Sequence, residues 1–196
     1  MTAPDLRAVA MAGHTGDTPT ARAGLASPDP AVRAAALGAL ERLDSLDDQT
    51  LADALRDGDG AVRRRAAEIA AAHPSVDLLA CLHDPDDRVV EVAAWACGEH
   101  EARRDHIIQR LVDLARSAPD PLVRESAVAA LGAIGDERGR AAIIAACVDK
   151  PAVRRRAVLA LAPFDGDDVE AAIEQALVDR DWQVRQAAED LRRAQS

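Results

Sequence analysis

The chain has 196 residues, of which 48% are hydrophobic and 30% charged, and its formal net charge is -10. With two Trp, one Phe and no Tyr, it is unlike a protein built on a sheet rich in aromatic residues, and it favours helices packed through Ala, Leu and Val. The acidic charge opposes non-specific binding to nucleic acid, and no stretch approaches the roughly 18 to 20 apolar residues that span a bilayer. We therefore expect a cytoplasmic, all-α protein.

The chain contains six similar segments, each of which aligns on a valine. Asp stands three residues before the valine in five segments, where it can cap a helix N-terminus, and Ala stands four residues after it in all six, one turn further along the same face. Successive valines are separated by 30, 27, 34, 30 and 31 residues, enough for two short helices and two turns. The valines are Val32, Val62, Val89, Val123, Val153 and Val184.

Each valine therefore marks the second helix of a two-helix repeat, and a shorter first helix is expected ahead of it. Thr18-Pro19 and Ser75 are typical of such helix starts. We expect first helices near 18–27, 47–57, 75–84, 102–117, 137–148 and 167–179, and an extra N-terminal helix near 4–12. The repeats then cover approximately 18–43, 47–73, 75–100, 102–134, 137–163 and 167–195 of a single domain, 1–196.

One segment shows a resemblance to a known family. "PDPLVRESAVAALGAIGD" at 119–136 resembles the HEAT repeats, in particular the subtype named for phycobiliprotein lyases, along its whole length. The resemblance extends over about residues 18–195. It implies a right-handed α-solenoid of about six HEAT-like helix pairs, a class whose members mostly serve as binding and assembly surfaces.

An arginine follows the valine in five repeats, and the third repeat has Val90 in its place. The family resemblance implies that this arginine pairs with aspartates in the turns, which forms a structural ladder along the array. Candidate partners are the five aspartates before the valines and also Asp57, Asp84 and Asp179. The predicted ladder consists of Arg33, Arg63, Arg124, Arg154, Arg185, Asp29, Asp59, Asp86, Asp120 and Asp181.

A second set of residues is expected to point away from the core. Positions two, six and nine after each valine face opposite to the valine on a helix, and the second helices of HEAT solenoids usually line the concave face. Trp95 falls in this row near the middle of the array, although a rotated third repeat would instead bury it. The predicted partner-binding residues are Arg64, Glu68, Glu91, Trp95, Glu125, Arg155 and Leu159. Basic and acidic groups alternate among them, which suits a protein or a peptide better than a phosphate backbone.

Catalytic and metal motifs are sparse. Cys81, Cys97 and Cys147 are widely spaced, as buried thiols are, and one His-Glu pair, His100-Glu101, does not supply the several ligands of a di-metal site. We expect no catalytic residue, no metal and no cofactor. The leading hypothesis is thus a non-enzymatic, monomeric scaffold that binds another protein or peptide on its concave face.

Two alternatives remain. The family resemblance also allows an accessory subunit or lyase-type enzyme that acts on a bound cofactor or modified protein. The triplets Arg63–Arg65 and Arg154–Arg156 allow phosphate or nucleic-acid binding, although the acidic charge of the chain makes nucleic acid an unlikely partner.

Overall fold

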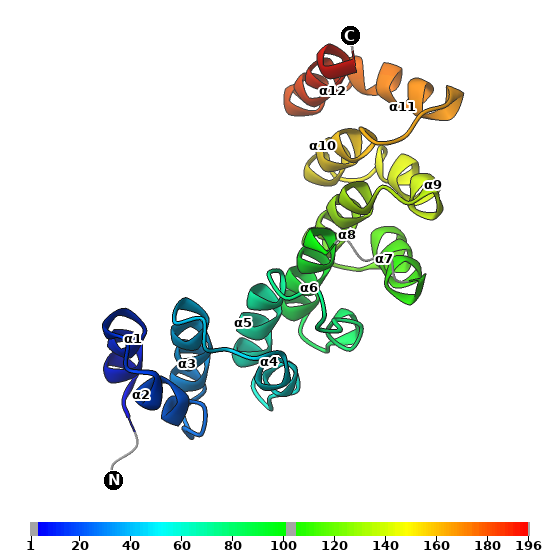
Figure 1. Ribbon diagram of the computed structural model, residues 1–196. Helices are drawn as coiled ribbons and strands as arrows, with labels where there is room; N and C mark the ends of the chain where they lie inside the picture. Colours follow the sequence, from blue (N-terminus) through cyan, green and yellow to red (C-terminus); the bar gives the residue numbers. More distant parts are fainter. Residues whose placement is uncertain (1–3, 101–104, 196) are drawn as a thin grey trace.

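The computed structural model describes residues 4–100 and 105–195. These residues form twelve α-helices, a short 3-10 helix and no strand (Figure 1). The helices are α1 (Leu6–Thr15), α2 (Thr18–Gly24), α3 (Pro30–Arg42), α4 (Asp48–Ala54), α5 (Gly60–Ala70), η1 (Cys81–His83), α6 (Asp87–Glu99), α7 (Asp105–Ser117), α8 (Pro121–Ile134), α9 (Glu137–Ala146), α10 (Pro151–Ala160), α11 (Asp167–Leu177) and α12 (Trp182–Gln195).

The helices stack in two curved rows. In Figure 1 the second helices of the repeats, α3, α5, α6, α8, α10 and α12, form the inner row, and α4, α7, α9 and α11 lie outside it. The expected α-solenoid is therefore confirmed, and its concave side is lined by the second helices.

The repeated valine and alanine hold the two rows together. All six valines are at most 4% exposed, and the alanine four residues later is fully buried in every repeat, because the small side chain lets the neighbouring helix approach. These alanines are Ala36, Ala66, Ala93, Ala127, Ala157 and Ala188. The aromatic-poor composition thus supports a core of close helix contacts.

The third repeat departs from the prediction. An α-helix was expected near 75–84, but only Cys81–His83 is helical there, as a single 3-10 turn. Val76, Leu78 and Leu82 are nevertheless buried, so the segment still covers the core. Length is not the reason, since residues 71–86 between α5 and α6 are as many as residues 135–150, which hold α9. Instead, the Asp77 side chain accepts a hydrogen bond from the backbone N–H of Leu79 at 3.1 Å, a local turn that competes with a helix.

The predicted N-terminal helix is present as α1, displaced to Leu6–Thr15, and it packs against α3 in line with the inner row. Of the expected helix at 102–117, residues 102–104 lie outside the described residues, and the rest forms α7. Within the described ranges, no helix is both long and apolar enough to cross a membrane.

Candidate protein-binding surface

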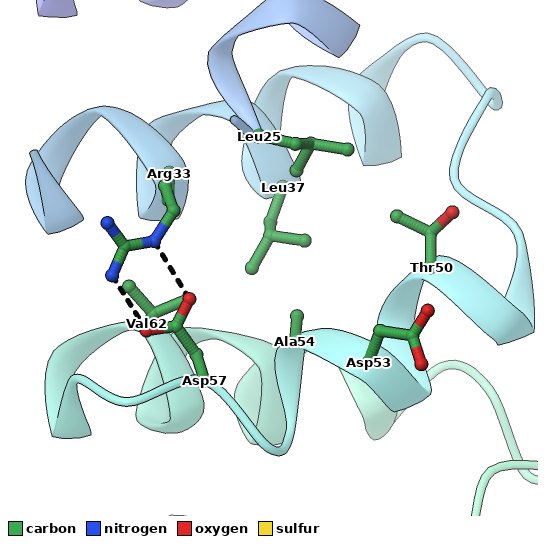
Figure 2. Close-up of a pocket in the computed structure, with 8 residues that line it drawn as sticks. All are labelled: Leu25, Arg33, Leu37, Thr50, Asp53, Ala54, Asp57 and Val62. Atoms are coloured by element: carbon green, nitrogen blue, oxygen red, sulfur yellow. Dashed lines mark hydrogen bonds and ion pairs between the residues drawn. The ribbon is translucent and has the colours of Figure 1, made fainter. Parts of the chain in front are cut away.

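In four repeats the arginine after the valine pairs with a carboxylate of the next repeat. Arg33 Nη2 lies 2.7 Å from Asp57 Oδ1, and Nη1 of the same guanidinium donates to the carbonyl of Ser27 at 2.9 Å (Figure 2). Three further arginine–aspartate pairs join successive repeats in the same way, and we call each such pair a rung of the ladder. They are Arg63–Asp84 at 2.6 Å, Arg124–Asp149 at 2.6 Å and Arg154–Asp179 at 2.8 Å.

These hydrogen bonds tie successive repeats together electrostatically. The bond from Arg33 lowers the pKa of Asp57, against an opposing effect of burial. Arginine bonds lower the pKa of the other rung carboxyls in the same way, at Asp84, Asp149 and Asp179. The outermost arginine of the series, Arg185, donates to the carbonyl of Asp179 at 2.7 Å, and no carboxylate among the described residues pairs with it.

The five aspartates that we had assigned to the ladder have a different role. Asp29, Asp59, Asp86, Asp120 and Asp181 each accept a hydrogen bond from the backbone N–H two residues later, at 2.8 to 3.0 Å. They cap the second helices, and the arginine carboxylate bonds go to aspartates earlier in the same turns. Their side chains sit at the helix start, where the first free N–H groups are closer than any ladder guanidinium.

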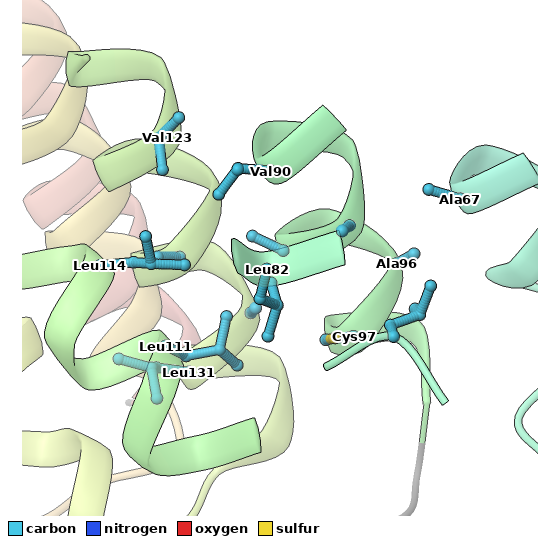
Figure 3. Packing of buried hydrophobic residues seen from close by; sticks show 14 of the residues in the cluster. Ala67, Leu82, Val90, Ala96, Cys97, Leu111, Leu114, Val123 and Leu131 are labelled. Carbon is cyan, nitrogen blue, oxygen red and sulfur yellow. The ribbon is translucent and has the colours of Figure 1, made fainter. Parts of the chain in front are cut away.

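The ladder is interrupted between repeats three and four. Val90 replaces the arginine, and Ala118 occupies the position that Asp84 has in the preceding repeat, so both charges of this rung are missing together. Figure 3 shows Val90 directed toward Val123 across this junction. Arg110 of α7 donates from Nε and Nη2 to the carbonyl of Leu82, at 3.1 and 3.0 Å, and so links the two repeats by another route.

A first cavity on the inner row contains four of the predicted partner-binding residues. It measures about 270 Å³, and its walls come from α5 and α6 alone. Trp95 is 42% exposed in it, which answers the question that the sequence left open. The lining residues are Arg64, Glu68, Glu91, Val92 and Trp95.

A second cavity lies three repeats further along the same row. It measures about 250 Å³, lies between α10 and α12, and includes the predicted residues Arg155 and Leu159. Its largest side chain is Trp182, which is 64% exposed and which the sequence prediction missed. Trp182 occupies the first turn of α12, where the other repeats have Pro, Gly or Asp, and this unusual position could have indicated it.

The remaining predicted residue, Glu125, lies between the two cavities. Its carboxylate is half-buried and lies 3.7 Å from Arg156 Nε. Glu91 accepts a hydrogen bond from the Ser126 hydroxyl at 3.1 Å. Both acidic groups are therefore partly engaged within the inner row.

Three glycines of the row expected to face outward do not line the concave face. A β-carbon on Gly132 would lie 2.7 Å from Ala160 Cα, and one on Gly98 would lie 2.9 Å from Ala130 Cα, so both face the next inner helix. Gly38 is covered by the guanidinium of Arg65. Each inner helix has neighbours on two sides, which narrows its free surface to fewer positions than a lone helix would have.

No chemistry typical of an active site accompanies these cavities. Among the described residues there is no group of three or more His, Cys, Asp or Glu side chains arranged to hold a metal ion. Burial raises the pKa of Cys81 and of Cys147 to about 11. His100 is buried with Nε2 2.8 Å from the Ala70 carbonyl, and its sequence neighbour Glu101 lies outside the described residues.

Comparison with known proteins agrees with this architecture. Residues 75–152 match the family model of the HEAT repeats, and none of the curated proteins matches the chain. A designed armadillo repeat protein in complex with the peptide (KR)4 has a TM-score of 0.65 at 19% identity, over 92% of this chain and 100% of that one.

Two natural proteins have similar folds. The Escherichia coli protein YibA has a TM-score of 0.69 at 18% identity, over 93% of this chain and 70% of that one. Importin beta has a TM-score of 0.60 at 17% identity, over 95% of this chain and 30% of that one. These likenesses show that the chain has an α-solenoid repeat fold. Within this fold, residues 75–152 match the HEAT repeats, as the segment at 119–136 indicated.

Proposed function

We propose that this protein is a non-enzymatic, monomeric scaffold whose concave face binds another protein or a peptide. The observation that carries the proposal is the exposure of Trp95 in a cavity on the inner row. Phe164 is the one Phe, Tyr or Trp side chain in the buried core, whereas Trp95 is 42% exposed on the concave face, where a partner can reach it. Large aromatic side chains at the centre of a concave surface are typical anchors of protein interfaces.

The groups around Trp95 support the same proposal. Arg64, Glu68 and Glu91 line its cavity, and a mixed rim of this kind gives a partner orientation and specificity. The designed armadillo protein of similar fold is in complex with a peptide, which is consistent with peptide binding by a solenoid of this size. We extend the proposed surface to Glu125, Arg155 and Leu159, and we place the protein in the cytoplasm.

A pull-down from the native source, identified by mass spectrometry, tests the proposal. We expect Trp95→Ala to lose specific partners that the wild type captures. The matched control is Leu122→Ala, since Leu122 is 61% exposed but lies at the start of α8, outside both cavities. Equal capture by wild type and Trp95→Ala would exclude the first cavity from the interface.

The lyase-type alternative makes a separate prediction. A preparation with visible absorbance or a co-purifying metal would favour it, and a colourless, metal-free preparation would count against it.

A further inference from the structure

The two tryptophans of this protein have the same kind of surroundings, although they lie three repeats apart. Trp95 and Trp182 are the only tryptophans of the chain, and each lies in an inner-row cavity of similar volume. Each cavity also contains an arginine, Arg64 in the first and Arg155 in the second. The concave face therefore has two separate sites of one type, an exposed indole beside a guanidinium.

These two arginines differ from Arg65, Arg156 and Arg193 of the same row, which are paired with carboxylates. Arg65 is neutralised by Glu68 at 2.8 Å, Arg156 by Glu125 at 3.7 Å, and Arg193 by Asp190. Within the part of the chain that the structure describes, Arg64 and Arg155 make no hydrogen bond or ion pair with another side chain. Both tryptophans thus stand beside an arginine that remains available to a partner.

We propose that the two cavities are paired subsites for one acidic peptide segment, in which two large apolar side chains each stand beside a carboxylate. Each apolar side chain packs on Trp95 or Trp182, and the adjacent carboxylate pairs with Arg64 or Arg155. This inference rests on the proposed function and specifies the chemistry of its partner.

The spacing of the cavities sets the spacing of the two motifs. From α6 to α12 the inner row advances by three helices, and at helix-packing distances of about 9 Å this amounts to about 27 Å. An extended chain rises about 3.3 Å per residue, so the two apolar side chains are separated by about eight residues. An even separation places both side chains on the same face of the extended segment.

The carboxylates in the cavities favour a peptide over a nucleic acid. Glu91 stands in the first cavity and Asp190 in the second, and a backbone with a phosphate at every nucleotide would bring negative charge against both. A peptide can place its charges opposite the arginines alone.

Intrinsic fluorescence tests this inference directly, because each subsite holds one of the two tryptophans. In Trp182→Phe only Trp95 reports, and in Trp95→Phe only Trp182 reports. The probes are three synthetic 14-residue peptides without aromatic residues, with two Leu eight positions apart. Each Leu is flanked by Glu in the first peptide, by Gln in the second and by Lys in the third.

We expect the Glu peptide to shift the emission of both reporters and to bind about tenfold more tightly than the Gln peptide, as two partly exposed ion pairs allow. Arg64→Gln and Arg155→Gln should each remove part of this preference. Arg116→Gln is the matched control, since Arg116 is exposed on the outer helix α7, and it should leave binding unchanged.

Other outcomes overturn the inference in distinguishable ways. Tighter binding of the Lys peptide, or equal binding of all three, contradicts the proposed charge while peptide binding itself stands. A response from one tryptophan only contradicts the pairing of the subsites. Displacement of the Glu peptide by a single-stranded RNA oligonucleotide at low concentration assigns the arginines to phosphate. If no peptide binds but Trp95→Ala still loses its native partners, the chemistry is wrong and the proposed function survives.

Discussion

The hexapeptide AVRRRA occurs twice in this protein, at 61–66 in α5 and at 152–157 in α10, and the two copies use their third arginine differently. Arg65 pairs with Glu68 of its own helix, while Arg156 reaches back to Glu125 of the preceding repeat. The neighbours explain this, since Leu159 stands where a counterpart of Glu68 would be and Ala34 stands where a counterpart of Glu125 would be.

The first arginine behaves alike in both copies, apart from its degree of burial. The side chain of Arg63 is 15% exposed in its rung with Asp84, and that of Arg154 is 6% exposed in its rung with Asp179. The identical hexapeptide thus fixes the pairing of the first arginine at the repeat junction. Residues later in the same helix and in the preceding repeat decide how the third arginine pairs on the concave face.

The largest expected effect separates the two rungs. Asp179→Ala leaves Arg154 buried without its counter-ion, and we expect the free energy of unfolding to fall by about 3 kcal/mol. Asp84→Ala should cost less, because Arg63 retains more contact with water. Urea denaturation measures both, and the exposed Arg64→Gln should stay within about 0.5 kcal/mol of the wild type. Equal losses in all three variants would contradict a structural role of the rung.

The same rung has a defined pH dependence. The bond from Arg154 lowers the pKa of Asp179 below its usual 3.8. The stabilisation is therefore present above that value and is lost as the pH falls through the folded-state pKa. The difference between wild type and Asp179→Ala should shrink in acid, and a constant difference down to about pH 2 would contradict the assignment.

A smaller effect distinguishes the two glycines that face the helices of the hexapeptides, Gly38 against α5 and Gly132 against α10. A β-carbon on Gly132 would meet the backbone of α10 at Ala160, so we expect Gly132→Ala to destabilise the protein by about 2 kcal/mol. A β-carbon on Gly38 would meet only the end of the Arg65 side chain, which can move aside. Gly38→Ala should therefore be neutral in the same denaturation experiment, and an equal loss would show that the two junctions are packed alike.

The residues eleven positions after the two valines, His73 and Phe164, predict that stability depends on pH at the first position only. His73, eleven residues after Val62, contacts Glu41 and Asp48 at 3.0 Å each, whereas the equivalent Phe164 is buried. Burial opposes protonation of His73, but the two carboxylates outweigh it and raise the pKa above 6.5. Its stabilisation is fully present below 6.5 and is lost as the pH rises through the folded-state pKa.

In the wild type, the free energy of unfolding should fall by about 0.5 to 1 kcal/mol between about pH 6 and about pH 9, and His73→Phe should abolish this fall. Thermal denaturation across this range measures it. His14→Phe serves as the control, since His14 is exposed near the end of α1, and a flat wild-type profile would contradict the prediction.

The smallest effect concerns the third arginines themselves. Double-mutant cycles on Arg65 with Glu68 and on Arg156 with Glu125 should each give a coupling of about 0.5 kcal/mol that salt weakens. Coupling between Arg65 and Glu125 should be absent, and its presence would mean that the two copies share one charge network.

Much of the fold was predictable because each repeat has the same residue types at the positions that determine helix starts and buried faces. The valine and the alanine four residues later fix the buried face, and the aspartate before them fixes the helix start, so α3 to α12 lie close to their expected places. The third repeat could not be predicted in detail because a local turn at Asp77 replaces the first helix, while the apolar residues of this segment still pack. Periodicity alone does not show this.

The candidate surface was less predictable than the fold. Helical phase placed Arg64, Trp95, Arg155 and Leu159 correctly on the inner row, but it also placed Gly132 there, since phase ignores the neighbouring helix. Trp182 was missed because it precedes the valine, and only the docking of α12 against α10 brings it into the second cavity.

The interruption of the ladder affects which repeats can be deleted without leaving an arginine unpaired. Removal of residues 57–83 would bring Asp84 to the place of Asp57, so Arg33 would have an equivalent carboxylate partner at the new junction. Removal of residues 84–117 would instead set Arg63 against Ala118 and leave its charge unpaired. Loss of one repeat within either run of rungs therefore keeps an arginine opposite an aspartate, whereas loss across the junction of repeats three and four leaves an arginine opposite an alanine.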